Sequence, residues 1–269
     1  MKNIIIILLF LVAFNGSSQE DEKSQKIKNL GYKVEKHYEY LTKFGEIDTS
    51  TKFLEKRIEF NNEGRVKKTE QYFRGDDSNE YGYVATFKYD EKSNIIKLVN
   101  YNAKGNIKNV IKYEYRDSLM RVIRIYSKDG DLTTKVEYEY NKQNEPIKYI
   151  SYDSSGKFEG KNTYEYDSNN KLKKTSTFNK EKKLASYTLY KNTDSTKVYK
   201  DYNNKNELEL EVSKKLDSNG MVLISLRNWL KYDSHSKTIY EYDINGLEIK
   251  RTEFGKNGEP EKFIIIERN

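Results

Sequence analysis

The sequence predicts an all-β protein: an antiparallel, up-and-down meander of about sixteen strands, built from repeats of about 26 residues and forming a curled or superhelical sheet. Two aromatic series and the polarity of the segments between them lead to this fold class. The anchor series recurs every 24 to 29 residues, at Phe60, Tyr89, Tyr115, Tyr140, Tyr166, Tyr190, Leu216 and Tyr242. The second series falls between the anchors, at Tyr101, Tyr126, Tyr152, Phe178, Tyr202 and Phe254. Between successive turns, polar and apolar residues alternate with the period of a β-strand.

The N-terminal segment predicts export. Lys2 precedes an apolar run of eleven residues, and small residues end at Ser18, a pattern typical of a cleaved secretory signal peptide over residues 1–18. A membrane anchor is the alternative, but about 20 apolar residues are needed to span a bilayer. The chain contains no cysteine, so neither a lipid-modified cysteine nor a disulfide is available. The exported protein must therefore be stable without covalent cross-links.

Three segments follow from these patterns. Cleavage after Ser18 leaves a polar leader over residues 19–31, which we expect to be mobile or briefly helical because it is densely charged. Residues 32–269 form the β-repeat domain, with clear repeats over 57–262 and a degenerate first repeat from Tyr32. The polar segment 74–83 predicts a longer loop. Residues 263–266 are all apolar and predict a last strand that is covered on both faces.

Composition favours a thin sheet over a thick core. Hydrophobic residues make up 35% of the chain and charged residues 34%, and the mean hydropathy is -0.97, yet 24 tyrosines and 11 phenylalanines argue against disorder. The net charge of +7 is spread over interleaved lysine and glutamate, as on a solvated face. A basic protein of this kind permits weak attraction to anionic polymers or lipopolysaccharide, but mixed signs and export argue against nucleic acid.

Each repeat predicts a strand end, a tight turn and a strand start. An Asp or Asn side chain bonds the backbone two residues on, as we expect at Asp90, Asn102, Asp153 and Asp243. A glycine then accepts positive φ, which is expected at Gly64, Gly105, Gly130, Gly156, Gly220 and Gly246. In the strand that follows, Val136 and Tyr138 point one way while Lys135, Glu137 and Glu139 point the other.

Sixteen strands at roughly 4.8 Å spacing give a sheet about 77 Å wide, which is too wide to stay flat. The accumulated right-handed twist predicts a curved shell with its aromatic face on the concave side. A sandwich and a closed barrel are the other two solutions.

The repeat units resemble the YD-repeat family, also called Rhs repeats, over about residues 57–262. The resemblance is carried by YDEKSN from Tyr89, YDSSGKF from Tyr152, YDSNNKL from Tyr166, LDSNGMV from Leu216 and YDINGLEI from Tyr242. It implies curling β-sheet shells in surface or secreted proteins. The toxin domain of the long family members has no counterpart after Phe254, and eight units give too little wall to enclose a protein, so the resemblance brings no catalytic residue.

Catalytic and metal-binding patterns are absent from the sequence. The two histidines, His37 and His235, lie in polar contexts and are expected at the surface, and no Gly-rich phosphate loop is present. Asp76, Asp77, Asp129 and Asp131 are expected to form turns, because calcium loops need several converging oxygens; calcium at Asp76 and Asp77 is the alternative. Glu137, Glu139 and Glu165 are expected to pair with neighbouring lysines across strands and not to act as glycosidase carboxylates. We predict no catalytic residue, no metal and no cofactor.

Four strands end in a pair of tyrosines two residues apart, and these pairs are the one group with binding potential: Tyr113 and Tyr115, Tyr138 and Tyr140, Tyr164 and Tyr166, and Tyr240 and Tyr242. One tyrosine from each pair is assigned as a candidate ligand-binding residue: Tyr113, Tyr138, Tyr164 and Tyr240. A ladder of such rings on a concave face suits sugars or an extended polypeptide. The alternative is that the rings form the core of the sheet.

The predicted function is therefore a non-enzymatic exported repeat protein, a binding or scaffold module for a partner protein or polysaccharide at the cell envelope. We expect it to be secreted or periplasmic, without stable membrane insertion after the signal is removed and without nucleic acid as a partner. Two alternatives stay open. One is a glycan-active enzyme; the other is an outer-membrane β-barrel, which needs a continuous lipid-facing apolar band.

Overall fold

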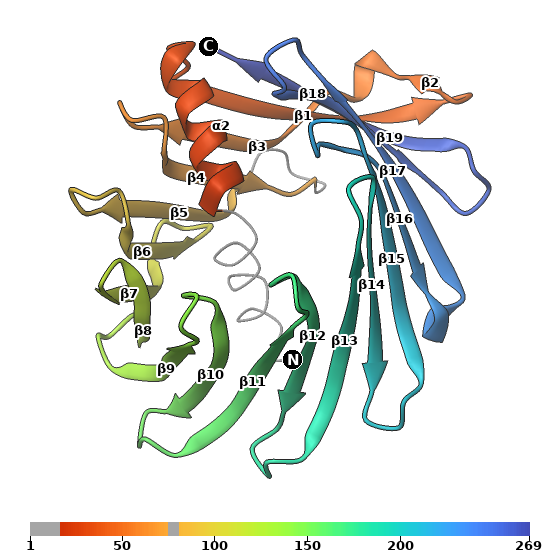
Figure 1. Ribbon diagram of the computed structural model, residues 1–269. Helices are drawn as coiled ribbons and strands as arrows, with labels where there is room; N and C mark the ends of the chain where they lie inside the picture. The colour runs from red at the N-terminus through yellow and green to blue at the C-terminus, as the bar shows by residue number, and fades with distance from the viewer. Residues whose placement is uncertain (1–16, 75–80) are drawn as a thin grey trace.

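The computed structural model describes residues 17–74 and 81–269, and these form one closed antiparallel β-barrel with a helix at one end (Figure 1). Each strand pairs with the next one along the chain, and β1 pairs with both β19 and β3, which closes the ring. Only the two-residue β2 lies outside it, so eighteen of the nineteen strands form the wall. The predicted antiparallel meander is thus confirmed. The prediction of a curled or superhelical sheet is wrong, because the sheet closes into a barrel.

The elements follow in chain order. They are α2 (Ser17–Asn29), β1 (Val34–Lys43), β2 (Glu46–Ile47), β3 (Phe53–Phe60), β4 (Val66–Tyr72), β5 (Tyr81–Tyr89), β6 (Ile95–Asn102), β7 (Ile107–Arg116), β8 (Leu119–Ser127), β9 (Leu132–Tyr140), β10 (Pro146–Asp153), β11 (Phe158–Tyr166), β12 (Leu172–Phe178), β13 (Leu184–Asn192), β14 (Thr196–Asn203), β15 (Leu208–Leu216), β16 (Val222–Trp229), β17 (Ser234–Tyr242), β18 (Glu248–Phe254) and β19 (Pro260–Arg268). Two short 3₁₀ turns, Thr49–Thr51 and Leu230–Tyr232, lie between strands.

The sixteen predicted strands correspond to β3 through β18, and the two terminal strands complete the ring. β1 lies in the degenerate first repeat, and β19 contains the apolar residues 263–266. Phe263 and Ile264, which point to opposite faces of β19, are 8% and 1% exposed, so the prediction that this strand is covered on both faces is confirmed. We call the β1–β19 junction the seam.

A repeated turn explains how the wall bends. In most turns an Asp or Asn side chain accepts hydrogen bonds from the backbone N–H groups two and four residues on, as Asp153 does from Ser155 and Lys157, both at 2.9 Å. The predicted glycines all adopt positive φ, for example 81° at Gly156. Most hairpins also carry a β-bulge directly before the aromatic that precedes the turn, as between Glu165 and Tyr166. Bulges increase local twist and bend the strand, so their repetition curls the sheet until its ends meet.

The two aromatic series lie on opposite faces of the wall. Anchor residues such as Tyr140 point inward and pack on a core cluster formed by Leu98, Ile111, Ile123, Val136 and Tyr138. Second-series residues point outward: Tyr126 and Phe178 each lie beneath a lysine of the outer face, Lys112 and Lys161. The concave aromatic face predicted from the sequence is therefore formed by the anchor series.

Helix α2 covers one end of the barrel beside the seam (Figure 1). Ile27 is completely buried against Ile58, Phe60 and Leu247, which belong to the strands and turns on both sides of the seam. The turn at Gly64 approaches the helix so closely that a Cβ there would lie 2.0 Å from the Ser24 carbonyl oxygen. Of the two states expected for the polar leader, the helical one is confirmed, and the helix is docked. The signal peptide was predicted over residues 1–18, and residues 1–16 lie outside the described range. Its last two residues, Ser17 and Ser18, form the start of α2.

The longer polar loop expected over residues 74–83 is shorter in the structure, because β5 already begins at Tyr81. Residues 75–80, which include Asp76 and Asp77, lie outside the described residues, as does any calcium site there.

Candidate functional site

A band of tyrosines lines the inner face of the barrel. Tyr138 on β9 lies directly opposite Tyr149 on β10, and their ring centroids are 5.7 Å apart. Tyr149 in turn lies 6.3 Å from Tyr164 on β11. Tyr113 on β7 packs against the same cluster. These four rings, with Ile123 of β8 between Tyr113 and the others, span strands β7 to β11, and we call them the tyrosine wall.

The tyrosine wall is only partly buried. Tyr138 is 4% exposed and is a core residue, whereas Tyr113, Tyr149 and Tyr164 are half-buried. Burial raises the pKa of Tyr149 to about 12 and raises the pKa of the other three phenols further. The phenols therefore stay neutral at physiological pH and offer ring faces and hydroxyls, not charge.

The structure brings three of the four predicted ligand-binding tyrosines together. Tyr113, Tyr138 and Tyr164 all belong to the tyrosine wall, while Tyr240 lies on β17 in a different group. Arg227 and Arg251 lie close enough to Tyr240 to oppose the rise in pKa that its burial causes, and Tyr199 on β14 is also near. Tyr149, Tyr190 and Tyr199 also face inward, but the sequence did not single them out as ligand-binding residues. The alternation of inward and outward residues along their strands is the signal that could have identified them.

The anchor tyrosines have a structural role instead. Five anchor hydroxyls donate to a backbone carbonyl 20 or 23 residues earlier, near the start of the preceding strand. The bonds run from Tyr89 to Val66, Tyr115 to Ile95, Tyr140 to Met120, Tyr166 to Pro146 and Tyr242 to Val222, at 2.6 to 3.0 Å. Since the acceptor is the first or second residue of that strand, each of these anchors ties the end of one strand to the start of the strand before it and fixes their register.

The outer face of the barrel is charged along the middle of its strands. Glu137, Glu139 and Glu165 lie in ion pairs with Lys135, Lys148 and Lys174, at 2.5, 2.6 and 3.9 Å. The pattern repeats farther round the barrel: Lys200 pairs with Glu211 and Lys250 with Glu241. The predicted pairing across strands is confirmed for Glu139 and Glu165, whereas Glu137 pairs with Lys135 of its own strand; none of the three faces the tyrosine wall.

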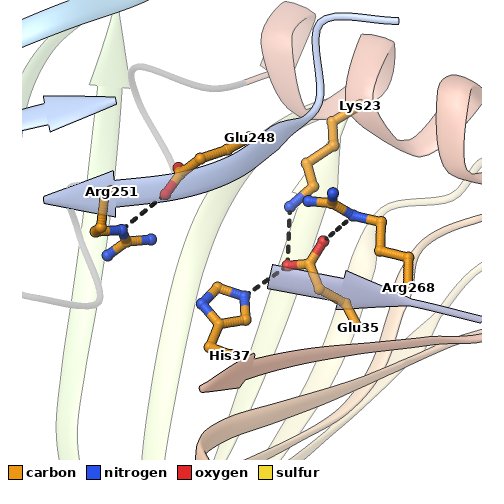
Figure 2. Close-up of polar contacts among 6 residues, drawn as sticks. All are labelled: Lys23, Glu35, His37, Glu248, Arg251 and Arg268. Carbon is orange, nitrogen blue, oxygen red and sulfur yellow. Dashed lines mark hydrogen bonds and ion pairs between the residues drawn. The ribbon is translucent and has the colours of Figure 1, made fainter. Parts of the chain in front are cut away.

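A buried polar cluster holds the seam and helix α2 together (Figure 2). Glu35 on β1 is 1% exposed; its carboxylate accepts from Arg268 Nε of β19 at 2.7 Å, bonds His37 Nε2 at 2.8 Å and lies 3.4 Å from Lys23 Nζ of α2. These partners hold the pKa of the Glu35 carboxyl far below its usual value, although burial acts in the opposite direction. Nearby, Arg251 Nε donates to Glu248 at 2.7 Å.

His37 corrects an expectation from the sequence. It was expected at the surface, yet it is 6% exposed, and burial lowers its pKa even though the Glu35 hydrogen bond favours the charged form. His235 is exposed on β17, as expected. The Glu35–His37 pair is enclosed and its partners join β1 to β19 and α2, so its geometry is that of a clamp and not of an accessible acid–base site. Within residues 17–74 and 81–269 no group of three His, Cys, Asp or Glu side chains is placed to hold a metal ion.

Two open hollows lie among the turns at one end of the barrel. The larger, about 670 Å³, is lined by residues that include Arg65, Phe87, Tyr89 and Asp90. The smaller, about 300 Å³, lies beside Asp167 and Tyr190. Both mix charges of either sign at the rim, which gives them no distinct ligand chemistry.

Comparison with known proteins gives likeness in shape only. No protein-family model and no curated protein matches the chain. One similar solved structure is a porin-like protein from Bacteroides uniformis, with 10% identity, covering 88% of this chain and 98% of that one, at a TM-score of 0.48. Another is a porin-like protein from Bacteroides vulgatus, with 9% identity, covering 87% of this chain and 97% of that one, at a TM-score of 0.29. Part of a Photorhabdus luminescens Tc holotoxin pore is also similar (12% identity, 77% of this chain, 11% of that chain, TM-score 0.33). At these identities and TM-scores the likenesses carry no functional argument.

None of the helices in the described part of the chain is long and apolar enough to cross a membrane.

Proposed function

We propose that this protein is an exported, non-enzymatic binding protein whose barrel interior binds a polysaccharide chain through the tyrosine wall. The observation that carries the proposal is the distribution of residue types: half-exposed rings face inward, while lysine–glutamate pairs occupy the outer face. We place it in the periplasm or outside the cell, in keeping with the signal peptide that the sequence predicts over residues 1–18.

The tyrosine wall has the chemistry that a sugar ligand needs. Tyr113, Tyr149 and Tyr164 are half-buried, so each is held by its neighbours yet keeps part of its ring accessible. A rigid aromatic that offers an apolar face and a polar hydroxyl binds ligands with little loss of side-chain entropy. Successive rings at about 6 Å spacing follow a chain and do not enclose a single small molecule. An extended ligand is therefore favoured.

The YD-repeat resemblance supports the repeat type in this proposal. The Tyr and the Asp of the motif have distinct tasks here, since the tyrosine bonds the preceding repeat and the aspartate closes the turn. Both tasks are structural. They are carried by the anchors and turns, and the proposal assigns ligand contact to the mid-strand tyrosines.

Binding is tested with tyrosine-to-leucine variants on a glycan array and with envelope extract. Tyr113→Leu and Tyr164→Leu keep most of the apolar volume but remove the ring face and the hydroxyl. We expect each to weaken binding of a captured glycan about tenfold with little change in melting temperature. Tyr152→Leu, on the outer face, is the matched control and should bind normally. Unchanged affinity in the folded inner variants would exclude the tyrosine wall as the binding surface.

An outer-membrane β-barrel is the second candidate. Closure and an even number of antiparallel strands favour it, as does the outward-facing second series of aromatics at one end of the barrel. The mid-strand ion pairs oppose it, because a lipid-facing band is apolar and a charged residue at the bilayer midplane costs about 2 to 4 kcal/mol. On balance, the outer face fits water better than lipid.

Cell fractionation separates the two candidates. We expect the mature protein in the periplasmic or extracellular fraction without detergent. Recovery only from detergent-extracted outer membranes would establish the membrane barrel in place of the water-soluble one.

A further inference from the structure

A cluster of unneutralised positive charges lies on the inner face, away from the tyrosine wall. Lys197 on β14 is directly opposite Lys214 on β15, and Arg227 on β16 is opposite Val212, two residues along β15 from Lys214. These strands alternate regularly here, so all three side chains point to the same face as Tyr199, which is opposite Val212 from the other side. We call Lys197, Lys214 and Arg227 the cationic patch.

The charges of the cationic patch act on one another. The pKa of Lys214 is lowered, first by its burial and then by the positive charges of Arg227 and Lys197. Among the described residues, no carboxylate lies within ion-pair distance of any of the three, although lysines on the outer face of the same strands are paired, as Lys200 is with Glu211. Three adjacent cations without a counter-ion repel one another and destabilise the empty barrel.

An acid of the inner face near the cationic patch, Asp201, is hydrogen-bonded to another residue. Asp201 lies on the same strand and face as Tyr199, but its carboxylate accepts a hydrogen bond from the Thr188 hydroxyl at 2.6 Å, and burial raises its pKa. Arg251, the next inner cation beyond Tyr240, is likewise occupied by Glu248. The cationic patch is thus a set of positive charges that neither Asp201 nor the Arg251–Glu248 ion pair neutralises.

Aromatic rings flank the cationic patch. Arg227 is near both Tyr199 and Tyr240, since its charge opposes the rise in the pKa of each phenol that burial causes. Both tyrosines are half-buried, and Arg227 is exposed although it lies on the inner face, so solvent reaches this part of the wall. Rings beside free cations form a surface that suits a sugar bearing a negative charge.

We propose that the cationic patch, with Tyr199 and Tyr240, binds the anionic groups of an acidic polysaccharide. Lys197, Lys214 and Arg227 neutralise the carboxylates or other acidic groups of the chain, and the two rings contact its sugar faces. This inference rests on the proposed function and deepens it, because it gives the charge of the ligand that enters the barrel. It also gives a role to Tyr240, the one predicted tyrosine outside the tyrosine wall.

The test uses oligomeric polygalacturonate and its fully methyl-esterified form, with binding to the mature protein measured by calorimetry at low and high salt. We expect the acidic oligomer to bind at least about tenfold more tightly than the ester and to lose affinity as salt rises. Lys214→Gln and Arg227→Gln should each weaken binding of the acidic oligomer about tenfold and leave binding of the ester unchanged. Lys215→Gln, an exposed outer-face lysine on the same strand, is the matched control and should change neither.

Several results would overturn the inference. Equal affinity for both forms, or wild-type affinity in the Lys214 and Arg227 variants, would remove the cationic patch from ligand binding while the tyrosine-wall variants continue to test the proposed function. Failure of both forms to bind would also remove it. Inorganic phosphate or single-stranded DNA binding as tightly as the acidic oligomer would show a general anion surface in place of a polysaccharide site.

Discussion

Tyrosine has three different tasks in this protein, and its position along the strand decides which one. Anchors directly before one set of turns donate their hydroxyls to a distant backbone carbonyl. Tyrosines two residues earlier form the inner wall. Those of the second series face outward beside lysines. A single residue type therefore supplies strand register, the inner aromatic surface and part of the outer face.

The anchor hydroxyl should make a measurable contribution to stability. Tyr166→Phe removes the 2.8 Å hydrogen bond to the Pro146 carbonyl and keeps the ring, so we expect the free energy of unfolding to fall by about 1 kcal/mol. Urea denaturation measures the change. Tyr152→Phe, in the second series on the outer face, is the control and should alter stability by less than half as much. Equal effects would show that the anchor bond adds nothing beyond an ordinary surface hydroxyl.

His37 shows where residue-level prediction fails. Its sequence neighbours, KHYEY, are polar or aromatic, and nothing among them indicates burial. Its hydrogen-bond partner Glu35 is held by Arg268 and Lys23, which belong to the other end of the chain and to the helix. Contacts between residues so distant in sequence leave no local pattern to read.

At the scale of elements, the hairpin with its turn is the unit that the sequence specifies well. Asp or Asn, glycine and the flanking aromatics all act within about ten residues, so turns, strands β3 to β18 and their alternation were predictable. Closure was not, because it depends on β1 pairing with β19. The docking of α2 was hidden as well: its segment reads as charged, and a single residue, Ile27, provides its buried apolar contact.

Helix docking is tested by comparing two glycines in equivalent turns. Gly64 and Gly105 have φ of 71° and 77°, so alanine is strained at both, by about 1 kcal/mol. A Cβ at Gly105 meets open space, whereas at Gly64 it collides with the backbone of α2. We therefore expect Gly64→Ala to lower the melting temperature clearly more than Gly105→Ala, and to expose α2 to proteolysis. Equal melting temperatures and equal protection of α2 in both variants would mean that the helix does not depend on this contact.

The whole barrel should be sensitive to acid through the seam. The folded state lowers the pKa of both Glu35 and His37, so the unfolded chain binds more protons on acidification. The contribution of His37 is complete above its ordinary pKa of about 6.5 and is lost as the pH falls below it; that of Glu35 is complete above about 4.3 and is lost at lower pH. We expect the melting temperature to fall in these two stages.

Matched histidine variants identify the first stage. His37→Gln retains a hydrogen-bond donor for Glu35 without a titrating group, and it should flatten the change in melting temperature between pH 7.5 and 5. His235→Gln removes the exposed histidine of β17 and should leave that change as in the wild type. If all three proteins lose stability in parallel over this interval, the seam histidine is not responsible.

The seam has a consequence for how the wall comes into being. Every other junction of the wall joins strands that are neighbours in the chain, or, for β1 and β3, are separated only by the two-residue β2, and it can form once both strands are present. The strand β1 can meet β19 only when residues 260–268 are present. Until then the nascent sheet has two open edges, with unpaired backbone groups available to any other strand. The N–H groups of Lys33 and Val34 both wait for one carbonyl, that of Asn269. Most of the sheet can thus be paired before the barrel is closed. The nine residues of β19 then convert an open sheet, whose two edges can pair with other strands, into a barrel that has no free edge.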